Sequence, residues 1–414
     1  METLIFNGNT KLSGEVTISG CKNSALPILI SCLTVKGKVC LYNLPSIGDV
    51  YLCIDILRYF GASISFEDKT TVTIDTSSAE YRPLPAALTE KLRASSYLLG
   101  AMLSRFGKCE LPLSGGCDIG VRPIDYHIKA LRSLGASLDK DSRILTADNG
   151  IRGGYVIFPT KTVGGTVNAI VASAVSKGTT KIINAAREPH VCDLCDFLRK
   201  CGADVSGDGS DVITVIGVER LHGCTHSIDH DMIEAGTYMI ASLATGGKIR
   251  CKFAPSKQLI SFFEVLKNIG ADVFTETSGV TVTSDRLKAT DVMTCPYPGL
   301  PTDLQPQLTA LLGISEGISS VTDTVFESRF RYLHELEKFG LEYECLDNTV
   351  KIKGIQSYLA ANVNATDLRG GAACIIAALN AKGKSVINNA NIIKRGYSDI
   401  ESKLRMLGAD VTLC

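Results

Sequence analysis

A cysteine within a glycine-rich segment is the first residue whose surroundings indicate chemistry. Cys117 lies in the run Leu113-Ser114-Gly115-Gly116-Cys117-Asp118-Ile119-Gly120-Val121-Arg122-Pro123. The three glycines of this run predict a loop that reaches solvent, as in a lid over a site. A nearby arginine lowers the pKa of an exposed thiol and makes it a proton donor or a nucleophile. A chance cysteine is the alternative, since the chain holds 15.

Polar or small residues recur at the start of six apolar runs that we expect to form helices. Each lies 14 residues before a glycine that closes the run, or 13 in the fourth copy. The six are Asn23, Arg93, Gly164, Glu234, Asp303 and Arg369. Free N–H groups and the helix dipole favour anions at such ends. Solvated helix caps are the alternative for any one of them.

Arginines also occupy the loops that follow the first strand of several copies. These are Arg122, Arg187, Arg329 and Arg395. Loops on a rigid scaffold commonly carry binding groups. The sequence therefore predicts two sets of basic residues, one at helix starts and one in loops, suited to an anionic ligand.

The elements that position these residues repeat six times. A glycine phrase closes an amphipathic stretch at Gly61, Gly135, Gly202, Gly270, Gly340 and Gly408, with intervals of 74, 67, 68, 70 and 68 residues. Such a period indicates one supersecondary unit built six times. In the first copy the apolar run Ile28 to Val35 predicts a buried helix, Val39 to Leu44 a strand and Asp49 to Tyr59 a second helix. Two further strands complete the order helix, strand, helix, strand, strand. The longest interval contains Cys117.

Composition describes an ordinary globular protein of 414 residues, with 45% hydrophobic and 21% charged residues. Lys and Arg together number 43, as do Asp and Glu, so the formal net charge is zero. We therefore expect neither nucleic acid nor an anionic membrane as a partner. The first residues lack the pattern of a signal peptide, and no run of 18 apolar residues occurs. A cytoplasmic protein is expected.

The cysteines and histidines do not favour a metal site. The odd number of cysteines and their scattered spacing indicate free thiols and not a disulfide framework. Cys192 and Cys195, with His190 nearby, lack a second such pair. His222, His226 and His230 are spaced by four residues, but Gly223 and the β-branched residues between them disfavour a helix. No metal and no cofactor is predicted.

Eight motifs along the chain match one enzyme family in order, from residue 20 to residue 397. They are Gly20-Cys21-Lys22-Asn23-Ser24-Ala25-Leu26-Pro27, Leu92-Arg93-Ala94-Ser95, Gly115 to Pro123, Asn184-Ala185-Ala186-Arg187-Glu188-Pro189, Pro301-Thr302-Asp303-Leu304-Gln305, Val325-Phe326-Glu327-Ser328-Arg329-Phe330, Ala365-Thr366-Asp367-Leu368-Arg369 and Arg395-Gly396-Tyr397. By these motifs the chain resembles the UDP-N-acetylglucosamine enolpyruvyl transferases (UDP-N-acetylglucosamine 1-carboxyvinyltransferases). Enzymes of that family catalyse the first committed step of bacterial peptidoglycan synthesis.

The resemblance implies an α/β fold of two inside-out α/β barrels. Each barrel would hold three α-β-α-β-β units with helices buried at its centre. Residues 20–229 would form one domain and residues 1–19 plus 230–414 the other, with the active site in the cleft between. Leu4 to Phe6 and Val16 to Ile18 are expected as strands before the first copy.

The same resemblance implies roles for individual residues. Phosphoenolpyruvate would transfer its enolpyruvyl group to the 3-hydroxyl of the nucleotide sugar, with release of phosphate. Asp303 would be the base on that hydroxyl and Cys117 the acid at C3 of phosphoenolpyruvate, while Asp367 would assist proton transfer. Lys22 and Arg395 complete the catalytic set. Phosphoenolpyruvate would be bound by Lys22, Asn23, Arg122, Arg329, Arg369 and Arg395, whose charges suit its phosphate and carboxylate.

UDP-N-acetylglucosamine would be bound by a longer set of residues. They are Asn23, Arg93, Arg122, Pro123, Ile124, Asp125, Tyr126, Thr160, Thr162, Val163, Gly164, Asp303 and Val325. The helix that opens at Thr162 would receive the diphosphate at its free N–H groups. Two positions depart from common family patterns: Tyr97 replaces a tryptophan of some members, and Lys161 lies one place from a lysine that often binds the diphosphate.

Two other functions remain open at this point. A 5-enolpyruvylshikimate-3-phosphate synthase shares the fold and phosphoenolpyruvate but lacks the Gly-Gly-Cys loop, so Cys117 discriminates between the two enzymes. A non-catalytic paralogue that only binds a nucleotide sugar would be expected to lose Asp303, Cys117 or the arginines. All of them are present in this chain.

Overall fold

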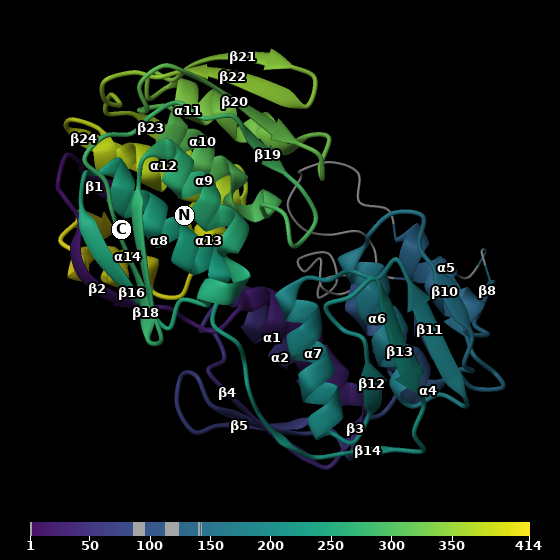
Figure 1. Ribbon diagram of the computed structural model, residues 1–414. Helices are drawn as coiled ribbons and strands as arrows, with labels where there is room; N and C mark the ends of the chain where they lie inside the picture. The colour runs from purple at the N-terminus through teal and green to yellow at the C-terminus, as the bar shows by residue number, and fades with distance from the viewer. Residues whose placement is uncertain (1, 86–95, 112–123, 140, 142) are drawn as a thin grey trace. The chain divides into compact units, whose positions relative to one another are not determined.

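The computed structural model describes residues 2–85, 96–111, 124–139, 141 and 143–414. They form two compact units. The described residues up to Ser19 and from His230 onward belong to unit 1, and those from Gly20 to Asp229 belong to unit 2. Figure 1 shows both units as α/β structures with strands around helices. No helix among the described residues is long and apolar enough to cross a membrane.

The first repeat of unit 2 shows the predicted order of elements. Its helix α1 (Lys22–Ser31) is followed by a short 3-10 turn, η1 (Cys32–Thr34), and strand β3 (Val35–Lys36). The expected helix therefore ends earlier than Val35, because the chain extends there before Gly37 turns it with a φ of +120°. Strand β4 (Lys38–Tyr42), helix α2 (Gly48–Tyr59) and strands β5 (Ser63–Phe66) and β6 (Val72–Asp75) complete the copy.

Two further copies follow in unit 2. The second contains α4 (Leu98–Phe106), β7 (Lys108–Glu110), α5 (Asp125–Ser133), β8 (Ser137–Asp139) and β9 (Ile144–Thr146). The third contains α6 (Val163–Ala174), β11 (Thr179–Ile183), α7 (Pro189–Lys200), β12 (Asp204–Ser206) and β13 (Val212–Ile216). Strands β10 (Tyr155–Ile157), β14 (Leu221–His222) and β15 (Thr225–Ser227) connect them.

Unit 1 repeats the order three times more. The copies begin with α8 (Met232–Ala244), α10 (Gln305–Leu312) and α12 (Leu368–Asn380). The first strands after these helices are β16 (Lys248–Lys252), β20 (Ile318–Asp323) and β24 (Lys384–Asn388). The remaining helices are η3 (Ser256–Gln258), α9 (Ile260–Ile269), η4 (Thr302–Leu304), η5 (Arg329–Tyr332), α11 (Leu333–Glu337), α13 (Ala390–Ile393) and α14 (Ile400–Met406). The remaining strands are β1 (Thr3–Asn7), β2 (Ser13–Thr17), β17 (Asp272–Glu276), β18 (Gly279–Thr283), β19 (Val292–Thr294), β21 (Glu342–Leu346), β22 (Thr349–Lys353), β23 (Asn362–Asn364) and β25 (Asp410–Leu413).

Each unit buries the first helix of its repeats. Every residue of α8 and of α10 is buried, and α8, α10 and α12 pack against one another. In unit 2, α4 packs against both α1 and α6. Helices that are apolar nearly all round must be covered on every side, so the sheets lie outside them. The predicted fold class, with repeated units and central helices, is confirmed.

The sheets show how the repeats are joined. In the order β15-β4-β6-β5, the three strands of one copy pair antiparallel and β15 adds to β4 in parallel. The strands β10, β2, β19 and β23 join other copies in the same way. The sixth copy differs, because β1 lies between β24 and β25 and pairs antiparallel with both. Residues from opposite ends of the sequence thus complete one sheet.

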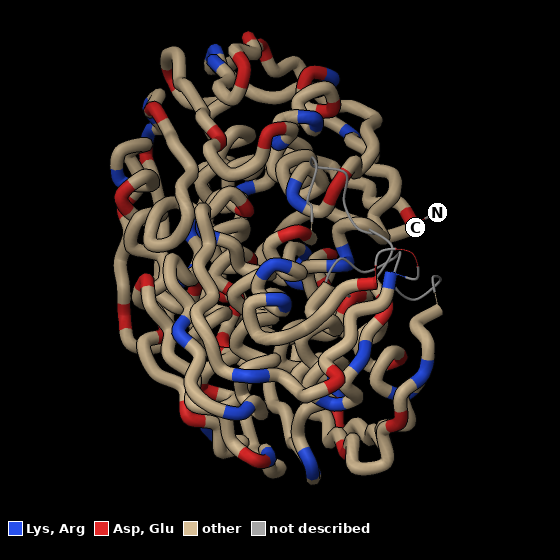
Figure 2. The backbone as a smooth tube through the Cα atoms, turned by 90° about the vertical axis from the view of Figure 1, so that its right-hand side faces the viewer, with Lys and Arg blue, Asp and Glu red and all other residues tan. Residues whose placement is uncertain are grey.

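The predicted charge balance is visible along the backbone, where Lys and Arg are interspersed with Asp and Glu (Figure 2). Several of the cysteines and histidines considered as metal ligands lie on different elements. Cys195 is buried on α7, and His222 and His226 are on strands β14 and β15. Among the described residues, no group of three His, Cys, Asp or Glu side chains is arranged to hold a metal ion.

Candidate active site

Unit 1 brings together three of the predicted site residues. Asp303 lies in η4, directly before α10, and its Oδ2 accepts a hydrogen bond from Arg369 Nη2 at 2.9 Å. Arg329 Nη2 lies 3.5 Å from Asp303 Oδ1. The side chains of Arg329 and Arg369 are only 1% and 5% exposed, whereas that of Asp303 is 29% exposed. A partly accessible carboxylate therefore lies between two buried guanidinium groups.

In this cluster two guanidinium groups share one carboxylate. Burial by itself would lower the pKa of Arg369, but the Asp303 carboxylate holds it above its ordinary value. Among the described residues, Arg369 Nη1 and Arg329 Nε are buried and have no hydrogen-bond partner. Buried donors of this kind are costly unless an acceptor meets them. The cluster is therefore suited to an anion with two or more oxygen acceptors.

Asp323 holds the backbone around this cluster, and the sequence reasoning did not single it out. Its Oδ2 accepts from the Thr302 hydroxyl at 2.6 Å, next to Asp303. Its Oδ1 accepts from the backbone N–H groups of Val325 and Phe326, both at 2.9 Å. Arg329 Nη2 in turn donates to the Thr302 carbonyl at 3.0 Å. An aspartate at the end of a strand, two residues before such a loop, is a recognisable turn signal.

A group of polar side chains, Tyr397, Thr237 and Gln307, supports the Arg369 guanidinium. The Arg369 guanidinium lies 5.4 Å from the centre of the buried Tyr397 ring, a cation–π contact. The Tyr397 hydroxyl is 2.9 Å from Thr237 Oγ1 and accepts from Gln307 Nε2 at 3.1 Å. Burial raises the pKa of Tyr397, so it stays a neutral phenol. Thr237 and Gln307 are polar residues inside apolar helices, which was the signal that could have identified them.

Three other predicted positions in unit 1 have defined surroundings. Asp367 is the N-cap of α12, because its Oδ1 accepts from the N–H groups of Arg369 and Gly370 at 3.0 and 3.1 Å. Arg395 is half-buried in the turn after α13, and Val325 is 38% exposed.

Glu234, the aligned helix-start residue of the fourth copy, forms a buried ion pair. Its carboxylate accepts from Lys403 Nζ at 2.7 Å and from the Ser19 N–H at 2.6 Å. Burial raises the pKa of Glu234, and Lys403 only partly offsets this. Glu234 therefore anchors the chain at Ser19, a different task from that of Asp303 at the equivalent position.

In unit 2, Lys22 is oriented by a residue that the sequence reasoning missed. Lys22 and Asn23 are the first two residues of α1, and both are partly buried. Lys22 Nζ lies 2.7 Å from Oδ2 of Asp49, a buried residue in the first turn of α2. The pair fixes the ammonium group at the helix start, because both side chains are largely removed from solvent.

Some of the residues predicted to bind a nucleotide sugar lie at the start of α6. Thr162 caps this helix by accepting from the Gly165 N–H at 3.3 Å, as expected. The Thr160 hydroxyl is 3.3 Å from the hydroxyl of Tyr126, which follows Ile124 and Asp125 on α5. The helices α5 and α6 pack against each other.

Gly164 and Lys161 refine this part of the site. A Cβ at Gly164 would lie 2.4 Å from the buried His127 ring, so no side chain fits there. Lys161 forms an ion pair with Asp211 and donates to the Ala185 carbonyl at 3.3 Å. Lys161 thus has protein partners of its own.

Four of the predicted site residues lie outside the described part of the chain. They are Arg93, Cys117, Arg122 and Pro123.

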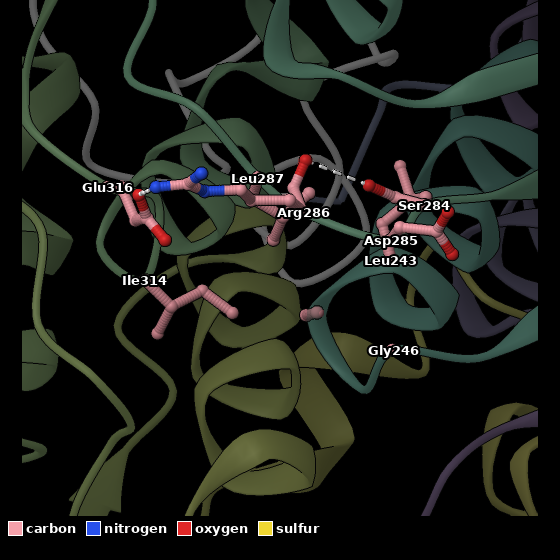
Figure 3. A pocket seen from close by; sticks show the side chains of 9 residues that line it. Leu243, Gly246, Ser284, Asp285, Arg286, Leu287, Ile314 and Glu316 are labelled. Carbon is pink, nitrogen blue, oxygen red and sulfur yellow. Dashed lines mark hydrogen bonds and ion pairs between the residues drawn. The ribbon is translucent and has the colours of Figure 1, made fainter.

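The pocket drawn in Figure 3 contains none of the predicted site residues. It has a volume of about 260 Å³ and is lined by residues around Leu243, Ser284 and Glu316. These lie near the C-terminal ends of α8 and α10, whereas Glu234 and Asp303 lie at the opposite ends. A helix as long as α8 spans about 20 Å, so this pocket is separate from the cluster around Asp303.

Comparison with known proteins identifies the family and supports the fold. The family model of EPSP synthase (3-phosphoshikimate 1-carboxyvinyltransferase) matches residues 6–404. The enolpyruvyl transferase NikO from Streptomyces tendae is 26% identical, with a TM-score of 0.88 over 100% of this chain and 99% of that one. An EPSP synthase from Acinetobacter baumannii is 17% identical, with a TM-score of 0.78 over the same shares, and so supports the fold. The chain therefore belongs to the EPSP synthase family of enolpyruvyl transferases.

Proposed function

We propose that this enzyme transfers the enolpyruvyl group of phosphoenolpyruvate to the 3-hydroxyl of UDP-N-acetylglucosamine and releases phosphate. The observation that carries the transfer chemistry is the Asp303 carboxylate between the buried guanidinium groups of Arg329 and Arg369. A base beside an anion clamp is what the addition of a hydroxyl to phosphoenolpyruvate requires. The choice of acceptor rests on the sequence motifs.

Phosphoenolpyruvate has a carboxylate and a phosphate, so it needs two positive sites. In this proposal Arg329 and Arg369 bind the carboxylate, and their unpartnered buried donors support that assignment. Lys22, Asn23, Arg122 and Arg395 bind the phosphate.

Asp303 removes the proton of the sugar 3-hydroxyl as its oxygen attacks C2 of phosphoenolpyruvate. Cys117 delivers a proton to C3, which gives a tetrahedral intermediate. Phosphate then leaves from C2 while C3 loses a proton, and the enol ether forms. C2 and C3 have the same oxidation states in phosphoenolpyruvate and in the enol ether, so the reaction needs no redox cofactor.

The start of α6 receives the diphosphate of the nucleotide sugar. The first-turn N–H groups of a helix have no carbonyl within the helix, so they can donate to an anion that binds at the helix start. Asn23, Arg93, Asp303 and Val325, with the segments Arg122 to Tyr126 and Thr160 to Gly164, make the remaining contacts in this proposal. In this proposal the product of the enzyme enters peptidoglycan synthesis, and the enzyme acts in the cytoplasm.

The second candidate is an enzyme that acts on shikimate 3-phosphate, which the name of the matching family model favours. Phosphate release separates the two. The protein is incubated with phosphoenolpyruvate and either UDP-N-acetylglucosamine, shikimate 3-phosphate or no acceptor. Release with the nucleotide sugar alone is expected. Release with shikimate 3-phosphate alone would transfer the assignment to the second candidate, and no release with any acceptor would contradict both.

A further inference from the structure

Two cysteines of unit 2 lie in contact, away from every residue assigned to the reaction. Cys201 directly follows α7, and Cys224 directly precedes β15; the position of α7 is visible in Figure 1. Their sulfur atoms are 3.2 Å apart. A disulfide bond has a length of about 2.05 Å, so closing the gap requires the two sulfur atoms to approach by roughly 1 Å.

The backbone holds both residues in place. The Cys201 carbonyl accepts from the His222 N–H at 2.9 Å, and the Cys224 carbonyl accepts from the Cys40 N–H at 2.9 Å. Gly223, between these attachments, packs so closely that a Cβ there would lie 2.1 Å from the Lys38 carbonyl oxygen. The thiols are therefore neighbours because the main chain is fixed on both sides, and not through a chance side-chain rotation.

The surroundings make the two thiols unequal. Cys224 is half-buried and Cys201 is buried. The hydrogen bond from Cys201 lowers the pKa of Cys224, burial opposes this, and the positive charge of Lys200 lowers it further. The same hydrogen bond and burial raise the pKa of Cys201. Lys200 is held nearby, since its Nζ lies 3.1 Å from Nδ1 of His226. A half-buried thiol with a lowered pKa, in contact with a thiol whose pKa is raised, is the arrangement of a dithiol that reacts with oxidants.

We infer that Cys224 and Cys201 form a reversible redox pair that hydrogen peroxide converts to a disulfide. The Cys224 thiolate attacks the outer oxygen of the peroxide, the O–O bond breaks, and the leaving oxygen takes a proton to become water. The Cys201 thiol then attacks the resulting sulfenic acid sulfur, loses its proton, and displaces the hydroxyl as a second water. The dithiol loses two electrons and two protons, and the peroxide gains them. The buried Cys32, which donates its S–H to the Ile28 carbonyl at 3.4 Å, stays a thiol.

The test uses the full-length reduced protein treated with hydrogen peroxide. Remaining thiols are alkylated after denaturation, and the peptides are mapped by mass spectrometry. We expect a peptide pair joined through Cys201 and Cys224, lighter by two hydrogen atoms and separated again by dithiothreitol. Activity is not the readout, because oxidation of the predicted proton donor Cys117 would also abolish it.

Variants assign the roles of the two thiols. In Cys201→Ser we expect Cys224 to accumulate as a sulfenic acid that dimedone traps, whereas Cys224→Ser forms no cross-link at Cys201. The matched control is Cys345→Ser, which removes an exposed cysteine and leaves the cross-link unchanged. Lys200→Met is expected to slow alkylation of Cys224 at pH 7 several-fold. Separate alkylation of Cys201 and Cys224 in wild-type protein, at a peroxide dose that oxidises Cys345, would overturn the inference even if a variant failed to fold.

Discussion

Replacement of Asp303 by asparagine tests both the chemistry and the electrostatics of the cluster in unit 1. The variant keeps the shape of the side chain and one oxygen that accepts from Arg369, but it has no charge and is a far weaker base. If Asp303 takes the proton of the acceptor hydroxyl, turnover should fall by about 10²- to 10⁴-fold, the contribution of a positioned general base. The assay is phosphate release at saturating phosphoenolpyruvate and acceptor.

The stability of the same variant follows from burial. Removing one partner of a fully buried ion pair costs about 3–5 kcal/mol. Asp303 is 29% exposed and asparagine retains one acceptor, so we expect a smaller loss, about 2 kcal/mol in the free energy of unfolding, which is below that range. For a unit of this size that is a decrease in Tm of about 4–8 °C.

An anion should restore part of this stability. Phosphoenolpyruvate is expected to raise the Tm of Asp303→Asn more than that of the wild type, because its carboxylate replaces the missing charge between Arg329 and Arg369. The control is Asp285→Asn, which removes an exposed carboxylate of the same unit and should change neither activity nor Tm. Turnover of Asp303→Asn within a few-fold of the wild type would refute the assignment of the base. An unchanged Tm would refute the argument from buried charge.

Three further predictions concern the supporting residues. Asp323→Asn should reduce turnover about tenfold, because the loop and turn beside the base lose a charged acceptor; steady-state kinetics with Tm measured in parallel would contradict this if only Tm fell. Glu234→Gln should gain stability relative to the wild type as the pH rises above about 4.5, the ordinary pKa of a glutamate. The pKa of Glu234 is raised in the folded state. The stability that the Glu234 carboxyl contributes is therefore fully present below its unfolded-state pKa and is lost as the pH rises through its folded-state pKa. Equal pH dependence of the two melting curves would disprove it. Gly164→Ala should cost about 1–3 kcal/mol by overpacking against His127 and raise the KM for the nucleotide sugar, whereas Gly48→Ala, where a Cβ meets nothing within 4 Å, should do neither; equal KM values for the two variants would count against a diphosphate site at α6.

Local sequence patterns were enough to predict the repeated elements. Helix α2 was expected from Asp49 to Tyr59 and is found from Gly48 to Tyr59, because an amphipathic stretch closed by a glycine determines its own limits. The same alignment placed Asp303 and Arg369 at equivalent helix starts, which is where they meet. Periodic hydrophobicity and turn residues act over a few residues, so they can be recognised without the fold.

The partners of the predicted residues could not be recognised in this way. Asp49 orients Lys22 from another helix, and Asp323 joins Thr302 to the loop of Val325 across 21 residues. From the sequence alone, any aspartate of the chain could have been the partner of these residues, because a contact between two elements produces no periodic pattern in the sequence. The same limit applies to Cys201 and Cys224, whose separation of 23 residues says nothing about their contact.

By itself the sequence determined that six like units are built, that the net charge is zero, and that acidic and basic groups recur at the starts of buried helices. Tertiary structure alone decided which of these groups share a site. In the folded chain Asp303 pairs with Arg329 and Arg369, Glu234 forms an ion pair with Lys403, and β1 lies between β24 and β25. The physical reason is that the identity of a side chain sets its charge and hydrogen-bonding capacity, whereas its partner depends on how distant segments pack.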